Sequence, residues 1–447
     1  MNKLGKKEPR MDTDEHGCDF LEKLLDGAEV EWKPLGEVAD IYGGLTGKSK
    51  KDFEDGNAKY ISYKNIFENI HIDFNDFSQV RVSENENQHD VRYGDVLFTG
   101  SSETAIEAGM SSAVTRGFQE EVYLNSFSFG VRFNDSITMI PEFSKYLFRS
   151  SFMRREIAKT ASGVTRFNIS KARFRKLLIP IPCPENPEKS LAIQAEIVRI
   201  LDTFTELTAE LTAELTARTK QYNYYRDQLL TFEDGEACLS GRQVEWKTLG
   251  EVLTDKFWIM PATPKFDETE EVPYITSKNI RGGNIDFNKV KFISRKDFQN
   301  LSRNRPILAG DFLISMIGTI GEVARVKEDD LDFYGQNMYL IRLNPNLILS
   351  GYFLHFFDSP KMKRHFNGVK NNSGQGYLKA NNIENIRVPI PPLAEQARIV
   401  AILDKFDTLT HSISEGLPRE IELRQKQYEY YRDLLLNFPK TQTKGVA

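Results

Sequence analysis

The chain contains one long internal duplication, which constrains its fold more than any other feature. Val30–Val38 (VEWKPLGEV) returns as Val244–Val252 (VEWKTLGEV), 214 residues later, and three or more residues are shared in each of five further blocks. These blocks recur in one order: Tyr60–Ile66 as Tyr274–Ile280, Gly94–Phe98 as Gly310–Ile314, Ile179–Pro182 as Val388–Pro391, Ile197–Phe204 as Ile399–Phe406, and Lys220–Asp227 as Lys426–Asp433. The period is far longer than that of a solenoid repeat. The chain is therefore predicted to hold two copies of one folded unit.

Each copy has the same internal order of segments. A globular segment comes first, with β-rich runs such as Val91–Phe98 and Tyr339–Leu343 that are separated by Gly, Asn and Asp. A short strap of the form X-Pro-Ile-Pro follows, and its prolines disfavour helix and mark a boundary. A long helical segment completes the copy.

The helical segments carry apolar residues at steps of three and four. After the first strap these are Ile197, Ile200, Leu201, Phe204, Leu207, Leu211 and Leu215. This spacing predicts one apolar stripe on a helix from about residue 193 to 230, roughly 57 Å long at 1.5 Å per residue. The second copy repeats the pattern, is interrupted at Glu415–Pro418 and resumes to about Leu436. Two such helices predict an antiparallel pair, with surface left over for a partner protein.

The expected fold class is α+β, with two globular α/β domains separated by two long antiparallel coiled-coil helices and a pseudo-two-fold internal repeat. The expected boundaries are an N-terminal extension at 1–29, a first domain at 30–190, a first helix at 191–232, a linker at 233–243, a second domain at 244–392, a second helix at 393–438 interrupted near 415–418, and a tail at 439–447.

Composition places the chain among ordinary globular proteins. Apolar residues make up 40% and charged residues 28% of its 447 residues. The charged start, Met1–Arg10, is not typical of a signal peptide, and no apolar run approaches the length of a membrane span. Cys18, Cys183 and Cys238 are too scattered for a disulfide framework or a zinc site. A reducing, cytoplasmic location is the simplest expectation.

Positive charge is concentrated at equivalent places in the two copies, although the net charge is −5. From Arg154 to Lys176 there are eight basic residues and one acidic residue, and from Lys361 to Arg387 six basic residues and one acidic residue. Each stretch contains a Gly- and Asn-rich loop with an aromatic residue, Ser162–Asn168 and Asn371–Tyr377. Solvated surface loops are the alternative interpretation, but recurrence in both copies favours DNA binding.

Lys and Arg side chains neutralise phosphates, whereas Asn, Gln and Arg read base edges through pairs of hydrogen bonds. On this chemistry the candidate DNA-binding residues are Lys64, Asn65, Arg166, Asn168, Lys171, Arg173, Arg175, Lys278, Asn279, Asn371, Asn372, Gln375, Tyr377 and Lys379.

Three segments together resemble a known family. Ile179–Pro182, Gln194–Phe204 and Lys220–Leu230 closely resemble the specificity subunits of type I restriction-modification systems. The doubled Thr-Ala-Glu-Leu, marked by Thr208, Leu211, Thr212 and Leu215, looks like the IC branch of that family and suggests a spacer repeat. The resemblance covers essentially Phe20–Phe438.

The resemblance implies two target-recognition domains that each read one half of a split, asymmetric DNA sequence. It also implies helices that dock two DNA-methylation subunits, with DNA-translocating restriction subunits joining that core. S-adenosylmethionine, ATP and Mg are then expected on the partner subunits and not on this chain.

The sequence offers no convincing signal for catalysis by this chain. Tyr42–Ser49 imitates a phosphate-binding loop but has Tyr42 where the pattern requires glycine. The six histidines have no metal-ligand spacing, and no catalytic residue or metal ligand is assigned. The alternative to DNA recognition is a coiled-coil scaffold with two protein-binding domains, which accounts for the duplication but not for the paired basic loops.

Overall fold

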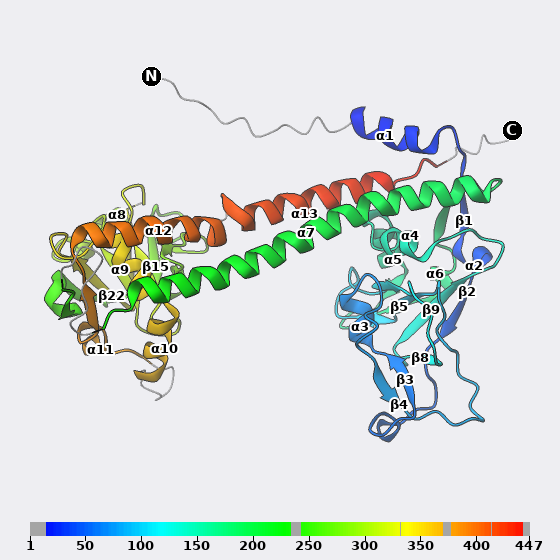
Figure 1. Cartoon of the computed structure of the whole chain (residues 1–447), viewed down its shortest axis with the longest axis horizontal. Helices are drawn as coiled ribbons and strands as arrows, with labels where there is room; N and C mark the ends of the chain where they lie inside the picture. Colours follow the sequence, from blue (N-terminus) through cyan, green and yellow to red (C-terminus); the bar gives the residue numbers. More distant parts are fainter. Residues whose placement is uncertain (1–14, 234–242, 331, 370–376, 413, 441–447) are drawn as a thin grey trace. The chain divides into compact units, whose positions relative to one another are not determined.

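A computed structural model describes residues 15–233, 243–330, 332–369, 377–412 and 414–440 (Figure 1). It divides the chain into two compact units. The first unit comprises Met1–Glu210 together with Glu422–Ala447, and the second comprises Leu211–Ile421. The first unit therefore includes the end of the second sequence repeat.

The first unit is built on a four-stranded antiparallel sheet with the order β2-β9-β5-β7. Its strands are Ala39–Gly43 (β2), Val96–Thr99 (β5), Ser111–Ala113 (β7) and Ser128–Phe133 (β9). Phe98 and Phe129 are buried between this sheet and its helices, with ring centroids 5.4 Å apart. Both also lie 5.0 Å from Phe174. This aromatic contact joins the sheet to the segment that precedes the strap.

A smaller sheet has the order β4-β3-β8, in which β3 (Ala58–Ile61) pairs antiparallel with β4 (Ser78–Val80) and parallel with β8 (Val122–Leu124). A third sheet, β10-β11-β6, includes the candidate loop Ser162–Asn168 as its β10–β11 hairpin. The remaining elements of this unit up to the strap are α1 (Glu15–Leu25), α2 (Leu35–Val38), η1 (Lys50–Phe53), α3 (Tyr63–Glu68), β6 (Ser101–Ser102), α4 (Pro141–Leu147), α5 (Ser151–Thr160), β10 (Ala161–Ser162), β11 (Phe167–Ile169) and α6 (Lys171–Phe174).

The second unit repeats this topology. Its main sheet has the order β14-β22-β19-β20 and its smaller sheet the order β18-β15-β21, again with one parallel pair. The elements are η2 (Leu249–Val252), β14 (Leu253–Ile259), β15 (Val272–Thr276), η3 (Ser277–Asn279), β16 (Ile280–Arg281), β17 (Asn284–Ile285), β18 (Lys291–Ile293), α8 (Arg295–Ser302), β19 (Phe312–Ser315), β20 (Val323–Arg325), β21 (Tyr334–Gln336), β22 (Met338–Leu343), α9 (Ser350–Phe357), α10 (Pro360–Val369) and α11 (Ala380–Glu384). The α+β class and the internal duplication are thereby confirmed.

The straps are β-strands, and each pairs with the block that opens its own repeat. β1 (Val30–Pro34) is antiparallel to β12 (Leu178–Pro182), and β13 (Glu245–Thr248) is antiparallel to β23 (Arg387–Ile390). Each of these sheets has only two strands, so the strap prolines need no hydrogen-bonding partner on their other side. The opening block and the strap of each repeat thus contact each other, in the same way in both units.

The long helices differ in detail from the expected ranges. α7 spans Pro187–Leu230, 44 residues, so it begins before residue 191 (Figure 1). α12 (Leu393–His411) ends before the predicted interruption at 415–418, whereas α13 (Gly416–Leu435) already includes three of its four residues, so the break in the helix lies earlier than predicted. Pro418 lies in the first turn of α13, where a missing N–H costs nothing. The predicted β-run Val91–Phe98 was wrong in its first half, because Gly94 adopts a φ of +89° in a turn before β5.

Each unit contains a tyrosine-bearing helical segment from the other repeat. In the first unit, Tyr431 of α13 stacks on Phe204 of α7 with ring centroids 5.2 Å apart. In the second unit, Tyr225 of α7 stacks on Phe406 of α12 at 5.6 Å. These pairs are equivalent in the sequence repeat. The Lys-Gln-Tyr block of each repeat therefore completes the unit that is built mainly from the other repeat.

In the described part of the chain, no helix is both long and apolar enough to span a membrane.

Candidate nucleic-acid interface

The predicted loop Ser162–Asn168 forms a β-hairpin on the edge of a small sheet. Ser162 pairs with Asn168, and Asn168 also pairs with Ser101 of β6. Gly163 has a φ of +150°, and a Cβ there would lie 1.9 Å from the carbonyl oxygen of Arg166. Only glycine fits this turn. The hairpin holds Arg166 and Asn168 in solvent, and the Arg166 Nε donates to Ser101 Oγ at 3.0 Å.

The basic residues that follow the hairpin lie on the short helix α6 and its C-terminal end. Ser170 caps α6 by accepting from the Arg173 N–H at 3.4 Å. Phe174 is buried in the core, which directs Lys171, Arg173 and Arg175 to solvent. Since α6 starts directly after β11, three exposed cations lie next to a hairpin that exposes an arginine and an asparagine. This arrangement combines phosphate-binding and base-reading chemistry.

The second unit places its loop at the equivalent position. The Leu378 N–H donates to the Met316 carbonyl at 3.0 Å, as the Ile169 N–H donates to the Gly100 carbonyl at 2.9 Å. Tyr377 forms an isolated bridge with Ile317 and is 38% exposed, and Lys379 is exposed at the start of α11. The candidates Asn371, Asn372 and Gln375 lie outside the described residues.

A Lys-Asn pair recurs in both repeats, as Lys64–Asn65 and Lys278–Asn279, and its asparagine has a structural role. Asn65 is fully buried, and its amide donates to the carbonyls of Asp73 and Asp76 at 2.9 and 2.7 Å. Asn279 likewise accepts from the Thr276 N–H at 3.0 Å and donates to the Asp286 carbonyl at 2.9 Å. The structure therefore contradicts the assignment of Asn65 as a base-reading residue and gives the side chain of Asn279 local partners. Lys64 and Lys278 are exposed and stay candidates.

Not every cation in or just before the basic stretch is accessible. The Arg154 guanidinium donates to the carbonyls of Ile106 and Ala108 at 2.7 and 2.8 Å and also to that of Gly109. Arg149 donates to the carbonyls of Ser111 and three residues between 66 and 69 at 2.7–3.1 Å. Burial lowers the pKa of both guanidinium groups to about 10, so both stay protonated at neutral pH. Sequence reasoning missed this role because charge alone does not reveal burial.

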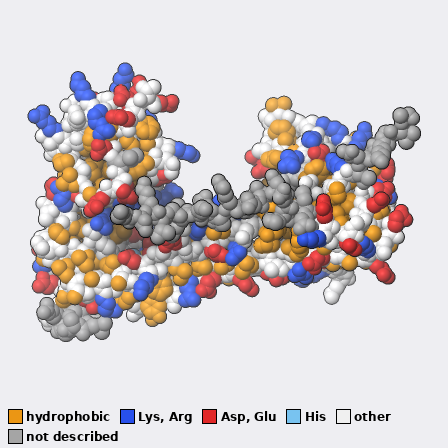
Figure 2. Space-filling view, turned by 90° about the horizontal axis from the view of Figure 1, so that it is seen from above, with side chains coloured by type: hydrophobic (Ala, Val, Ile, Leu, Met, Phe, Trp, Pro, Cys, Tyr) orange, Lys and Arg blue, Asp and Glu red, His pale blue; other side chains and the backbone are white. Residues whose placement is uncertain are grey.

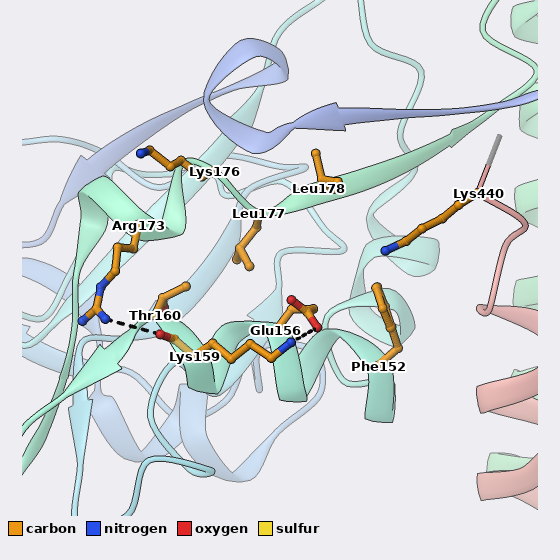
Figure 3. Close-up of a pocket in the computed structure, with 9 residues that line it drawn as sticks. All are labelled: Phe152, Glu156, Lys159, Thr160, Arg173, Lys176, Leu177, Leu178 and Lys440. Carbon is orange, nitrogen blue, oxygen red and sulfur yellow. Dashed lines mark hydrogen bonds and ion pairs between the residues drawn. The ribbon is translucent and has the colours of Figure 1, made fainter. Parts of the chain in front are cut away.

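Two pockets of similar size lie at equivalent places in the two units. The first, of about 330 Å³, lies between α5 and the start of the strap, and Lys159, Arg173, Lys176 and Lys440 contribute its positive charge (Figure 3). Within it, Lys159 pairs with Glu156 at 2.6 Å, and the Lys440 ammonium lies 5.2 Å from the Phe152 ring centroid. The second, of about 340 Å³, is lined by residues that include Lys361, His365, Arg387 and three asparagines.

On the face shown in Figure 2, side chains of both signs are interspersed over both units. In the sequence, the hairpin and α6 stand out because Arg166, Lys171, Arg173, Arg175 and Lys176 follow one another with no acidic residue between them. In the segment that imitates a phosphate-binding loop, the Lys48 ammonium pairs with Glu86 and donates to the Arg81 carbonyl, so its hydrogen bonds are made to a later segment of the same unit.

The doubled Thr-Ala-Glu-Leu lies inside α7 without a break. Leu211 and Leu215 are half-buried, whereas Thr212 is exposed. The Thr208 hydroxyl donates to the Phe204 carbonyl one turn earlier at 2.8 Å. An insertion or deletion of this four-residue unit therefore leaves the neighbouring residues in nearly the same helical register.

The fold and the interface define a class of duplicated α+β protein with an equivalent basic loop region in each unit and one long helix that enters both units. The sequence model of the family described as "Type I restriction modification DNA specificity domain" matches residues 28–221 and 242–423. The chain belongs to this family of type I restriction-modification DNA specificity proteins.

Several relatives match nearly the whole chain. The type I restriction enzyme EcoR124I/EcoR124II specificity subunit of Escherichia coli is 36% identical over 95% of this chain and 98% of its own length. A putative type I specificity subunit of Haemophilus influenzae is 32% identical over 94% and 98%. A solved structure of a type I restriction-modification system has the same fold, with a TM-score of 0.63 at 16% identity, and covers 91% of this chain and 97% of that one.

Proposed function

We propose that this chain is the DNA specificity subunit of a type I restriction-modification complex and that each unit reads one half of a split, asymmetric target. The observation that carries the proposal is the double match to the DNA specificity domain, because each matched segment includes one basic loop region. The scaffold interpretation is not favoured, since the relatives over the full length are named specificity subunits.

Recognition and chemistry are divided between subunits in this proposal. The chain contributes base and phosphate contacts and docks the methylation and restriction subunits. Two methylation subunits supply S-adenosylmethionine and transfer methyl groups to adenine, and the restriction subunits supply the ATP- and Mg-dependent steps. The chain itself binds none of these cofactors. The same proposal places the complex in the cytoplasm with its DNA.

The test is a methylation map. The chain, produced with its methylation subunits, is expected to methylate adenine in a site made of two different short half-sites that flank unread base pairs. The chain alone is expected to transfer no methyl group. Modified-base sequencing of substrate DNA measures both outcomes, with the methylation subunits alone as the control. A single continuous or palindromic site, or robust methyl transfer by the isolated chain, contradicts the proposal.

The length of the unread spacer is expected to depend on the doubled Thr-Ala-Glu-Leu. Four residues advance a helix by roughly 6 Å and turn it by about 40° beyond a full circle. One base pair advances DNA by about 3.4 Å and turns it by roughly 35°. Deleting Thr212–Leu215 is therefore expected to shorten the spacer by about one base pair and leave both half-sites unchanged.

The matched variant is a third copy of the repeat, which is expected to lengthen the spacer similarly. If the repeat serves only as helical filler, the deletion lowers stability without changing the target. The methylated sequence of each variant is the measurement. Active variants with an unchanged spacer would show that the repeat does not set the spacer length.

A further inference from the structure

The two units differ in length at two connections of their main sheets. Eleven residues, 100–110, join β5 to β7 in the first unit, whereas seven residues, 316–322, join β19 to β20 in the second. Three residues, 125–127, join β8 to β9, whereas one residue, Asn337, joins β21 to β22. The first unit therefore has six additional residues in these connections.

One longer connection contains β6, the other is hydrogen-bonded to the residue before it, and each exposes an apolar side chain. The Gly100 N–H, next to β6, donates to the Phe127 carbonyl at 2.8 Å. Phe127 is 67% exposed, and Ile106 in the other connection is 59% exposed. On its other side β6 pairs with β11, which carries Asn168. The two connections that carry these exposed apolar side chains thus adjoin the hairpin that presents Arg166 and Asn168.

Ile106 is exposed although the backbone that carries it is held in place by hydrogen bonds. Arg154 donates to three carbonyls of this connection, including that of Ile106. Gly109 adopts a φ of +66°, and a Cβ there would lie 2.6 Å from Ile157 and 3.1 Å from Ile169. At the position of Arg154 the second unit has Lys363, which pairs with Asp358 at 2.8 Å and with Glu322 of the shorter connection at 3.9 Å. The three hydrogen bonds from one guanidinium to backbone carbonyls are thus described for the longer connection, whereas the shorter one is contacted through a side-chain carboxylate.

The position of this surface indicates its ligand. A partner protein that is present in two copies would use features that both units share, and these connections are longer in the first unit only. A DNA target whose halves differ requires a surface that differs between the units. Apolar side chains beside arginine and asparagine suit base edges in a groove, where apolar contacts and hydrogen bonds discriminate together.

We propose that Phe127 and Ile106 form, with hairpin β10–β11, a base-contacting surface of the first unit that reads part of one half-site. The proposal rests on the proposed function, and its ligand is double-stranded DNA. Because both side chains are mostly exposed, their removal costs little stability. Their contribution is to discrimination between base pairs and not to neutralising phosphates.

The experiment uses Phe127→Ala and Ile106→Ala, each assembled with the methylation subunits, on DNA libraries in which one half-site or the other is randomised. Each variant is expected to lose about fivefold or more of the discrimination at one or two base pairs of the same half-site. The other half-site and the salt dependence of binding are expected to stay as in the wild type. The matched control is Phe20→Ala, another exposed aromatic residue of the first unit (43% exposed), which is expected to change neither half-site.

Unchanged base preference in both variants overturns the inference, and so does an equal change at both half-sites. Loss of assembly with unchanged base preference also overturns it, because it assigns the surface to protein docking. Failure of the proposed function is distinguishable, since the wild-type complex would then show no split site at all. The inference itself fails where the wild type reads two half-sites and the variants read them identically.

Discussion

Asp95→Ala is expected to lower the stability of the first unit by about 3–5 kcal/mol. Asp95 is fully buried and accepts from the Arg132 guanidinium at 2.8 and 2.7 Å, from the Tyr42 hydroxyl at 2.6 Å and from the Arg92 N–H at 2.8 Å. Removing it deprives the buried Tyr42 hydroxyl of its acceptor and leaves the partly buried guanidinium with the Asp90 carbonyl at 2.9 Å but without its carboxylate. Urea unfolding measures the loss of stability. Amide hydrogen exchange in β2, β5 and β9 shows whether the loss occurs in the first unit.

The duplicated fold offers a matched variant. Asp311 is buried at the equivalent place in the second unit and accepts from Arg342 at 2.7 and 2.9 Å. Asp311→Ala is expected to destabilise the second unit, and by less, because Arg342 keeps an ion pair with Asp255 at 3.0 Å. An equal loss of exchange protection in both units of Asp95→Ala would contradict this prediction, because the Asp95 carboxylate has its hydrogen-bonding partners in the first unit.

Changing Lys171, Arg173 and Arg175 together to Ala is expected to weaken DNA binding broadly and reduce its salt dependence. Each phosphate contact contributes about 0.9 to the slope of log K against log salt, so the slope should fall by about 2.7. Between 50 and 200 mM salt, the wild-type complex should then lose about 40-fold more affinity than the variant. Sequence preference should persist, because phosphate contacts position the protein without reading bases. A salt titration of the assembled complex is the measurement.

A control for net charge is available on α7. Arg199, Arg218 and Lys220 are cations of that helix, and changing them to Ala removes the same charge from a different surface. This control is expected to leave the salt slope close to the wild-type value. An equal fall in both variants would mean that overall charge, and not contact by α6, governs binding.

The duplication, the fold class and the long helices could be predicted because they are encoded locally, in repeated blocks and three- and four-residue spacing. Other features depend on distant parts of the chain. Asn65 belongs to a repeated Lys-Asn pair that suggests base reading, but its amide bonds to carbonyls eight and eleven residues later. Arg154 belongs to a basic run but faces a loop more than forty residues earlier. Neither environment can be read from neighbouring residues, so exposure had to come from the structure.

The candidate hairpin was recognisable because glycine, arginine and asparagine cluster in one short segment. The surface around Phe127 was not, since its significance comes from a comparison of connection lengths between aligned strands. A lone phenylalanine between two serines carries no signal of exposure. The sequence therefore predicts where the chemistry of phosphate binding lies better than which side chains distinguish bases.

The exchange of tyrosine-bearing helices between the repeats makes the order of the repeats along the gene arbitrary. Trp32 in β1 donates to the carbonyl of Pro439 at 3.0 Å, so the last described residues lie beside the strand that opens the first repeat. A gene rearranged to begin at the second repeat, with the old ends joined there, would encode the same pairings within each unit. The contacts within each unit would therefore be the same whichever of the two repeats came first in the chain.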